Sequence, residues 1–209
     1  MLKIIRGTVP LILALCVCAG FAGAQEGPEV FFGVGTAMAP SSNNLIDTFG
    51  TGNPFTTPRM GGTFGKFGAD IMIKPSFGIG GQADFKFSQG SYAGLNYRPT
   101  FWDFNGIFAP SRFKRVVPEL EAGLGGVNLK FYYSSAYCDQ FAGCSTSNQF
   151  IESSNHFQLH LAGGIRFYVT HHIFIRPQVD AHWDNNFYQF GSSWVPEYTG
   201  SIGWSFGEH

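Results

Sequence analysis

The chain has 209 residues, of which 17% are aromatic and only 13% are charged, and its formal net charge is −1. Ordinary soluble domains carry about 25% charged residues, so part of this protein's surface is not built to face water. A net charge this close to zero argues against a nucleic-acid-binding surface, and we expect no nucleic-acid partner.

The first predicted element is an export signal, residues 1–24. It begins with Lys3 and Arg6, continues with the apolar run TVPLILALCVCAGF and ends in small residues up to Ala24. This order is typical of a secretory signal peptide, and the run is too short for a confident membrane-spanning helix. We therefore expect cleavage after Ala24 and one mature domain, residues 25–209.

Eight segments with a period of two follow the signal. In one of them the apolar residues Ile79, Ala83 and Phe85 alternate with polar or small residues, which indicates a β-strand with two different faces. Most of the segments have about ten to fourteen residues, longer than the globular mean of roughly five to six and close to the roughly 9–11 of a tilted transmembrane strand. The predicted strands are residues 30–38, 63–73, 77–90, 92–102, 117–133, 156–169, 173–183 and 197–206.

The fifth segment changes phase along its length. Leu124 belongs to a set of apolar residues at even positions, whereas Val127 belongs to a set at odd positions. The change falls at Gly125-Gly126, and glycine tolerates the extra residue of a β-bulge. We therefore predict a bulge there.

The connections between the strands differ in length. Residues 74–76 and 170–172 form tight turns, whereas residues 40–59, 134–155 and 184–196 are long and rich in Ser, Asn, Gly and Pro. No domain boundary and no helical period is visible after the signal. The mature chain is therefore predicted to be a meander of antiparallel strands.

The apolar faces could point into the core of a β-sandwich or outward into lipid. The opposite faces are rich in Gly, Ala and Ser with single charges between them, which suits a narrow interior filled by side chains. Aromatic residues such as Phe131, Trp183 and Trp204 lie at strand ends, as in the aromatic girdles of membrane barrels. A sheet that spans lipid must close on itself. We therefore predict an all-β fold, an eight-stranded antiparallel transmembrane β-barrel with up-and-down meander topology.

The closing segment makes the resemblance more specific. Its alternating Tyr198, Ile202, Trp204 and Phe206 resemble the C-terminal strand that bacterial outer-membrane proteins present to their assembly machinery. The whole mature chain resembles the small eight-stranded OmpA/OmpX-type outer-membrane barrels. The resemblance implies a monomer in outer-membrane lipid, assembled by that machinery, with periplasmic termini, short periplasmic turns and long extracellular loops.

Two cysteines remain after the signal, Cys138 and Cys144, and they enclose five residues. In an exported protein such a pair usually oxidises, so we expect a disulfide in the third extracellular loop. Free thiols, or a metal site with a nearby His, are the alternatives.

Charged residues lie on the polar faces in equal numbers of each sign. We expect them to form cross-braced ion pairs that plug the barrel, because an unpaired buried charge is costly. Counting along the strands places Lys66 level with Asp84. The same residues could instead form a gate that opens when a pair breaks. The predicted interior network is Lys66, Lys86, Arg98, Lys130, Arg166 and Arg176 with Asp70, Asp84, Glu119, Glu121, Asp180 and Glu197.

One stretch invites an enzymatic interpretation. His182-Trp183-Asp184-Asn185, with Glu197 further along, has the outline of the His-x-Ser-Asn motif of lipid A deacylases, which are also eight-stranded barrels. Asp184 occupies the place of the serine nucleophile, and a carboxylate cannot serve as the His-activated hydroxyl. We therefore expect no catalytic residues, and we expect neither a cofactor nor a metal.

Three functions remain open. The leading hypothesis is a structural or surface-interaction protein that acts through its extracellular loops, although the residues name no ligand. A narrow, porin-like diffusion channel is the first alternative, and a lipid A-modifying enzyme is the second.

Overall fold

The computed structural model describes residues 27–110, 115–139 and 143–207, so the predicted signal peptide lies outside the described residues. Eight long strands and one short strand form one antiparallel sheet, and two further short strands pair with each other in a separate sheet. No helix among the described residues is long and apolar enough to cross a bilayer. The long strands are β1 (Glu29–Ala37), β4 (Phe64–Lys74), β5 (Phe77–Lys86), β7 (Leu95–Phe108), β8 (Val116–Asp139), β9 (Gly143–Tyr168), β10 (Ile173–Asp184) and β11 (Trp194–Ser205), and the short ones are β2 (Leu45–Ile46), β3 (Phe55–Thr56) and β6 (Gly90–Tyr92).

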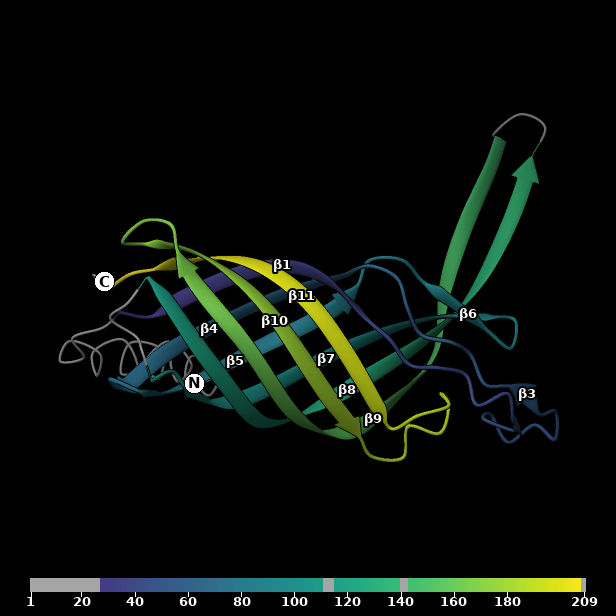
Figure 1. The fold of residues 1–209 in the computed structure, drawn as a ribbon. Coiled ribbons are helices and arrows are strands. Elements are labelled where there is room, and N and C mark those ends of the chain that lie inside the picture. The colour runs from purple at the N-terminus through teal and green to yellow at the C-terminus, as the bar shows by residue number, and fades with distance from the viewer. Residues whose placement is uncertain (1–26, 111–114, 140–142, 208–209) are drawn as a thin grey trace, which may run out of the picture.

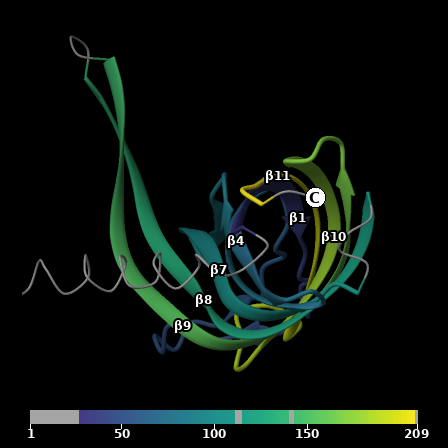
Figure 2. The same ribbon diagram turned by 90° about the vertical axis from the view of Figure 1, so that its left-hand side faces the viewer.

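The sheet closes into a barrel. Each long strand pairs with its neighbours in the chain, β5 pairs directly with β7, and β1 pairs with β11 from Glu29↔Ser205 to Ala37↔Glu197. The strands therefore surround a common axis (Figures 1 and 2). This confirms the predicted all-β, eight-stranded meander.

The two ends of the barrel differ. At one end, where β1 begins and β11 ends, Pro75 and Ser76 join β4 to β5 and residues 169–172 join β9 to β10; we call this the turn end. At the other end lie residues 38–63, the connection that contains β6, residues 185–193 and the tip of the β8–β9 hairpin. We call this the loop end.

The outer wall is apolar on every long strand. Outward side chains that are large, hydrophobic and exposed include Phe32, Phe67, Ile79, Phe104, Leu120, Leu161, Val179 and Ile202, one from each long strand. The residues between them point inward and are buried, and many are charged or amides. Apolar residues thus face out and polar residues face in, the reverse of a soluble domain.

The predicted bulge at Gly125-Gly126 is wrong. The pairing of β8 with both neighbours continues unbroken through these residues, and a shift occurs only between Phe131 and Tyr132. Glu121 and Val127 both point inward and are buried. The apolar residues change from even to odd positions because the interior is polar near Glu121 and apolar near Val127, toward the loop end. Gly125 is needed for another reason: a Cβ there would lie 2.6 Å from the Cα of Asp103 on β7.

The predicted loop 134–155 is also wrong, because most of it is β-structure. β8 and β9 stay paired from Val116↔Phe167 out to Asp139↔Gly143, far beyond the barrel wall (Figure 1). Tyr132 lies opposite Phe150, and their ring centroids are 6.1 Å apart. Tyr and Phe favour a pleated strand, and aromatic cross-strand pairs stabilise it, so this segment forms a hairpin despite its Ser and Asn residues.

Candidate functional site

The turn half of the interior holds two arginines among four carboxylates. Arg166 Nε lies 2.6 Å from Glu119 Oε2, its Nη2 lies 2.7 Å from Asp70 Oδ2, and its Nη1 pairs with Glu29. Arg176 Nη1 lies 3.1 Å from Glu121 Oε1, 3.2 Å from Asp70 Oδ2 and 3.4 Å from Glu119 Oε1. We call this group the arginine layer; its members are Arg166, Arg176, Glu29, Asp70, Glu119 and Glu121.

The arginine layer is buried and rich in acid. All six side chains are at most 5% exposed. Each guanidinium also lies over an aromatic ring: Arg176 is 3.6 Å from the centroid of Phe31, and Arg166 is 5.4 Å from that of Phe174. Because carboxylates outnumber the arginines, each cation has more than one partner, and no cation depends on a single carboxylate.

The middle of the barrel holds a second polar group. Lys66 Nζ lies 2.9 Å from Asp180 Oδ1, 3.5 Å from Glu197 Oε1 and 3.6 Å from Asp84 Oδ1. Two stacked imidazoles, His160 and His182, lie beside it, with ring centroids 4.9 Å apart. We call this group the histidine layer; its members are Lys66, Asp84, Asp103, Asn105, Gln158, His160, Asp180, His182 and Glu197.

Apolar side chains occupy both ends of the interior. Toward the loop end, Phe64, Phe101 and Leu129 belong to a fully buried cluster that also includes Phe187 and Phe190 from the β10–β11 connection. Toward the turn end, a second cluster lies against the arginine layer; it comprises Phe31, Met72, Ile107, Ala109, Val117, Tyr168 and Phe174. The polar layers therefore lie between apolar groups.

Two residues of the predicted interior network are misplaced. Arg98 and Lys130 lie opposite each other on β7 and β8, and both are exposed on the outside of the sheet. The face of β7 is the reverse of the predicted one: Tyr97 and Phe101 point inward and are buried. The alternation in this strand is regular, but its apolar residues near the loop end fill the interior.

The other predicted network residues are buried inside the barrel. Lys66 lies opposite Asp84 in the β4–β5 register. Lys86 lies at the loop end with its Nζ 5.1 Å from the centroid of the Tyr97 ring rather than in either layer. Sequence reasoning missed two buried carboxylates, Glu29 and Asp103. Glu29 lies on the inward face of β1, two residues before Phe31. Asp103 was assigned to the outside because the two faces of β7 were assigned in reverse.

The motif resembling the deacylase signature lies in the interior. His182 Nε2 is 3.1 Å from Glu197 Oε2, so these two side chains do meet, but both are fully buried. Asp184, at the place of the nucleophile, is buried as well. A lipid on the outer wall does not contact this pair.

The β8–β9 hairpin, residues 132–150, is the second candidate site. Tyr133, Tyr137 and Phe150 are at least half exposed on it, and the predicted disulfide between Cys138 and Cys144 is present near its tip. Residues 131–151 contain no Lys, Arg or Pro. From Tyr133 outward, each strand of the hairpin pairs only with the other, so its two outer edges are free of backbone pairing along the described residues.

No protein-family model matches the chain, and no curated protein is similar to it in sequence. Solved structures do share its fold. Neisserial surface protein A (NspA) is 15% identical, with a TM-score of 0.58 over 86% of this chain and 97% of its own. The outer membrane protein OprG from Pseudomonas aeruginosa is 11% identical, with a TM-score of 0.50 over 87% of this chain and 96% of its own. The chain therefore has the fold of the small outer-membrane barrels.

Proposed function

We propose that this protein is a bacterial outer-membrane barrel that acts at the cell surface through its β8–β9 hairpin, while its interior stays closed. The apolar outer wall and the polar interior support the membrane location, because lipid offers no hydrogen bonds to polar side chains. Short turns at one end and long connections at the other are typical of outer-membrane barrels, whose long loops are extracellular. The hairpin would then project from the cell.

The hairpin is the observation that carries the proposed role. Its exposed side chains are Tyr, Phe, Ser, Thr, Asn and Gln, and it has no basic residue. Tyrosines that supply rigid contact area, with small polar residues that adapt their hydrogen bonds, are the composition of antibody paratopes. A surface of this kind suits a protein partner better than a polyanion, which needs Lys and Arg.

The free edges of the hairpin add a mode of binding. Exposed edge strands are usually protected by Lys or Pro, and residues 131–151 contain neither. An extended segment of a partner can therefore add a strand by main-chain hydrogen bonds.

The two alternatives have less support. A channel needs a wet path along the axis, whereas buried Phe64, Phe101 and Leu129 lie across the loop end of the interior. An eight-stranded barrel is only wide enough for side chains to fill it. A lipid-modifying enzyme needs its reacting groups at the lipid surface, whereas His182, Glu197 and Asp184, which stands at the place of the nucleophile, are fully buried.

The test compares the intact protein with a variant in which residues 132–150 are replaced by a short turn. Outer-membrane vesicles carrying each protein are applied to arrays of immobilised proteins and sulfated glycans. We expect the intact protein to bind protein spots, the trimmed barrel to lose that binding, and the binding to survive high salt, because the hairpin carries little charge. Identical array patterns for the two proteins would contradict the proposal.

A further inference from the structure

The two histidines of the histidine layer are oriented alike. His160 Nε2 lies 2.9 Å from Asp180 Oδ1, and His182 Nε2 lies 3.1 Å from Glu197 Oε2. Each Nδ1 faces the other way: that of His160 lies 3.4 Å from Asp103 Oδ1, and that of His182 lies 2.7 Å from the Gln158 amide, which also reaches Asp103 Oδ2 at 3.4 Å. A carboxylate behind one ring nitrogen is the arrangement that orients metal-binding histidines.

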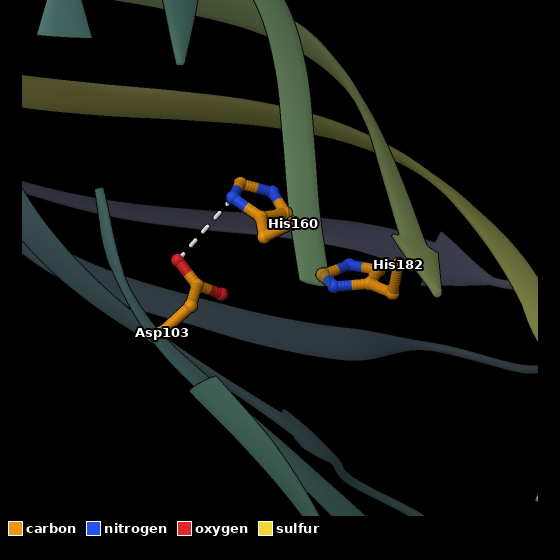
Figure 3. A group of neighbouring side chains, drawn as sticks. All are labelled: Asp103, His160 and His182. Carbon is orange, nitrogen blue, oxygen red and sulfur yellow. Dashed lines mark ion pairs between the residues drawn. The ribbon is translucent and has the colours of Figure 1, made fainter. Parts of the chain in front are cut away.

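The three side chains provide the donor set of a metal ion. Asp103, His160 and His182 come from β7, β9 and β10, are at most 1% exposed, and gather in the barrel interior (Figure 3). One candidate ligand atom from each lies within 4.8 Å of those of the other two. Zinc bonds of about 2.1 Å place tetrahedral ligands roughly 3.4 Å apart, so small side-chain rotations would complete the site.

The contacts of His160 favour a bound cation, because one ring nitrogen of a neutral imidazole faces acceptor oxygens here. A neutral imidazole carries one N–H, so His160 can donate to Asp180 from Nε2 or toward Asp103 from Nδ1, but not to both. In the tautomer with Nε2–H, that group donates to Asp180. The Nδ1 atom then presents its lone pair to Asp103 Oδ1 and to Asn105 Oδ1, which lies 2.9 Å away. The Asn105 amide nitrogen already donates to Asp103 and Glu121. A cation between Nδ1 and the Asp103 carboxylate would remove this repulsion.

The net charge of the histidine layer and an unsatisfied hydrogen-bond group within it also favour a bound cation. Apart from its imidazoles, the histidine layer has one cation, Lys66, against four carboxylates, all nearly fully buried. Such an excess of buried negative charge is costly. Gln158 is fully buried between His182 and Asp103, and its carbonyl oxygen has no hydrogen-bond partner among the described residues.

We propose that Asp103, His160 and His182 bind one zinc-type dication inside the barrel, with Gln158 or a water as the fourth ligand. Imidazole with a single carboxylate favours zinc and its transition-metal neighbours over Mg²⁺ and Ca²⁺, which prefer oxygen ligands. Because apolar clusters lie at both ends of the interior, the ion would enter while the barrel folds and exchange slowly afterwards.

The test refolds the chain without an added tag, in detergent, in the presence of Zn²⁺ with excess Mg²⁺ and Ca²⁺. Metal content is measured after desalting and a brief EDTA wash. We expect about one zinc per chain, and Co²⁺ in its place should give the visible absorption of a tetrahedral nitrogen–oxygen site. Zinc added after folding should be taken up far more slowly.

Three variants separate the site from adventitious binding. Asp103→Asn and His182→Gln should weaken the affinity for zinc at least about tenfold, so that the EDTA wash removes the metal, whereas His156→Gln, on the same strand as His160 but at the loop end, should leave the zinc content unchanged. If a variant does not fold, the Co²⁺ spectrum of the unmodified chain still decides. A folded barrel without zinc, or an Asp103→Asn barrel that keeps its zinc, would overturn the proposal. A proton between His160 and Asp103 would then explain their contact.

Discussion

Replacing Arg176 by Met should destabilise the barrel far more than removing one of its carboxylate partners. Arg176 is fully buried and lies within 3.4 Å of Asp70, Glu119 and Glu121. The change keeps most of the side-chain volume but leaves these carboxylates with Arg166 as the one remaining cation of the arginine layer. Breaking a buried ion pair from one side costs about 3–5 kcal/mol, so we expect a loss of that size.

Removing the charge of one carboxylate partner of Arg176 should change the free energy of unfolding only slightly. Glu121→Gln keeps an oxygen toward Arg176, which retains Asp70 and Glu119, and it lowers the acid excess of the layer. We expect a change within about 1 kcal/mol. The reason is that Arg176 has three carboxylate partners, so the loss of one charge leaves it paired with the other two.

Urea unfolding in lipid vesicles, followed by tryptophan fluorescence, measures these free energies. Arg98→Met is the matched control: it removes the same charge from the exposed face of β7, and a surface charge contributes about 0–1 kcal/mol. Equal losses for Arg176→Met and Arg98→Met would show that the arginine layer is hydrated, and the reasoning from dry ion pairs would be refuted.

Three further outcomes are expected. Replacing Cys138 and Cys144 by Ser should leave the unfolding free energy of the barrel unchanged but increase protease cutting within residues 132–150, because the hairpin tip can open without the barrel; mass spectrometry of the fragments locates the cuts. Gly125→Ala should cost about 1–3 kcal/mol, because its Cβ would meet the backbone of β7, whereas Gly200→Ala, with no atom within 4 Å of the added carbon, should stay within about 0.5 kcal/mol. The trimmed barrel without residues 132–150 should still fold, as circular dichroism would show.

The fold was readable from the sequence because a period of two survives along most strands. In β4, β5 and β10 the interior is polar over most of its height, so apolar residues mark the outside. In β7 and β8 the interior becomes apolar near the loop end, where Tyr97, Phe101 and Leu129 are buried. Alternation shows that two faces differ, but it does not show which face is inside once the interior changes character.

The candidate sites were harder to predict. The hairpin was taken for a loop because Ser and Asn are common in turns, and its cross-strand pairing depends on a partner strand. Asp103 was missed because of the reversed face of β7. His160 and His182 were on inward positions, but the closure of the sheet, not their spacing, brings them beside Asp103.

The most direct test of the surface-acting barrel is cysteine labelling of intact cells with a membrane-impermeant maleimide. Thr51→Cys lies at the loop end and Lys74→Cys at the turn end, and both positions are exposed. We expect Thr51→Cys to react in intact cells and Lys74→Cys to react only after the outer membrane is permeabilised. Reaction of both only after permeabilisation, or the reverse order, would contradict the account.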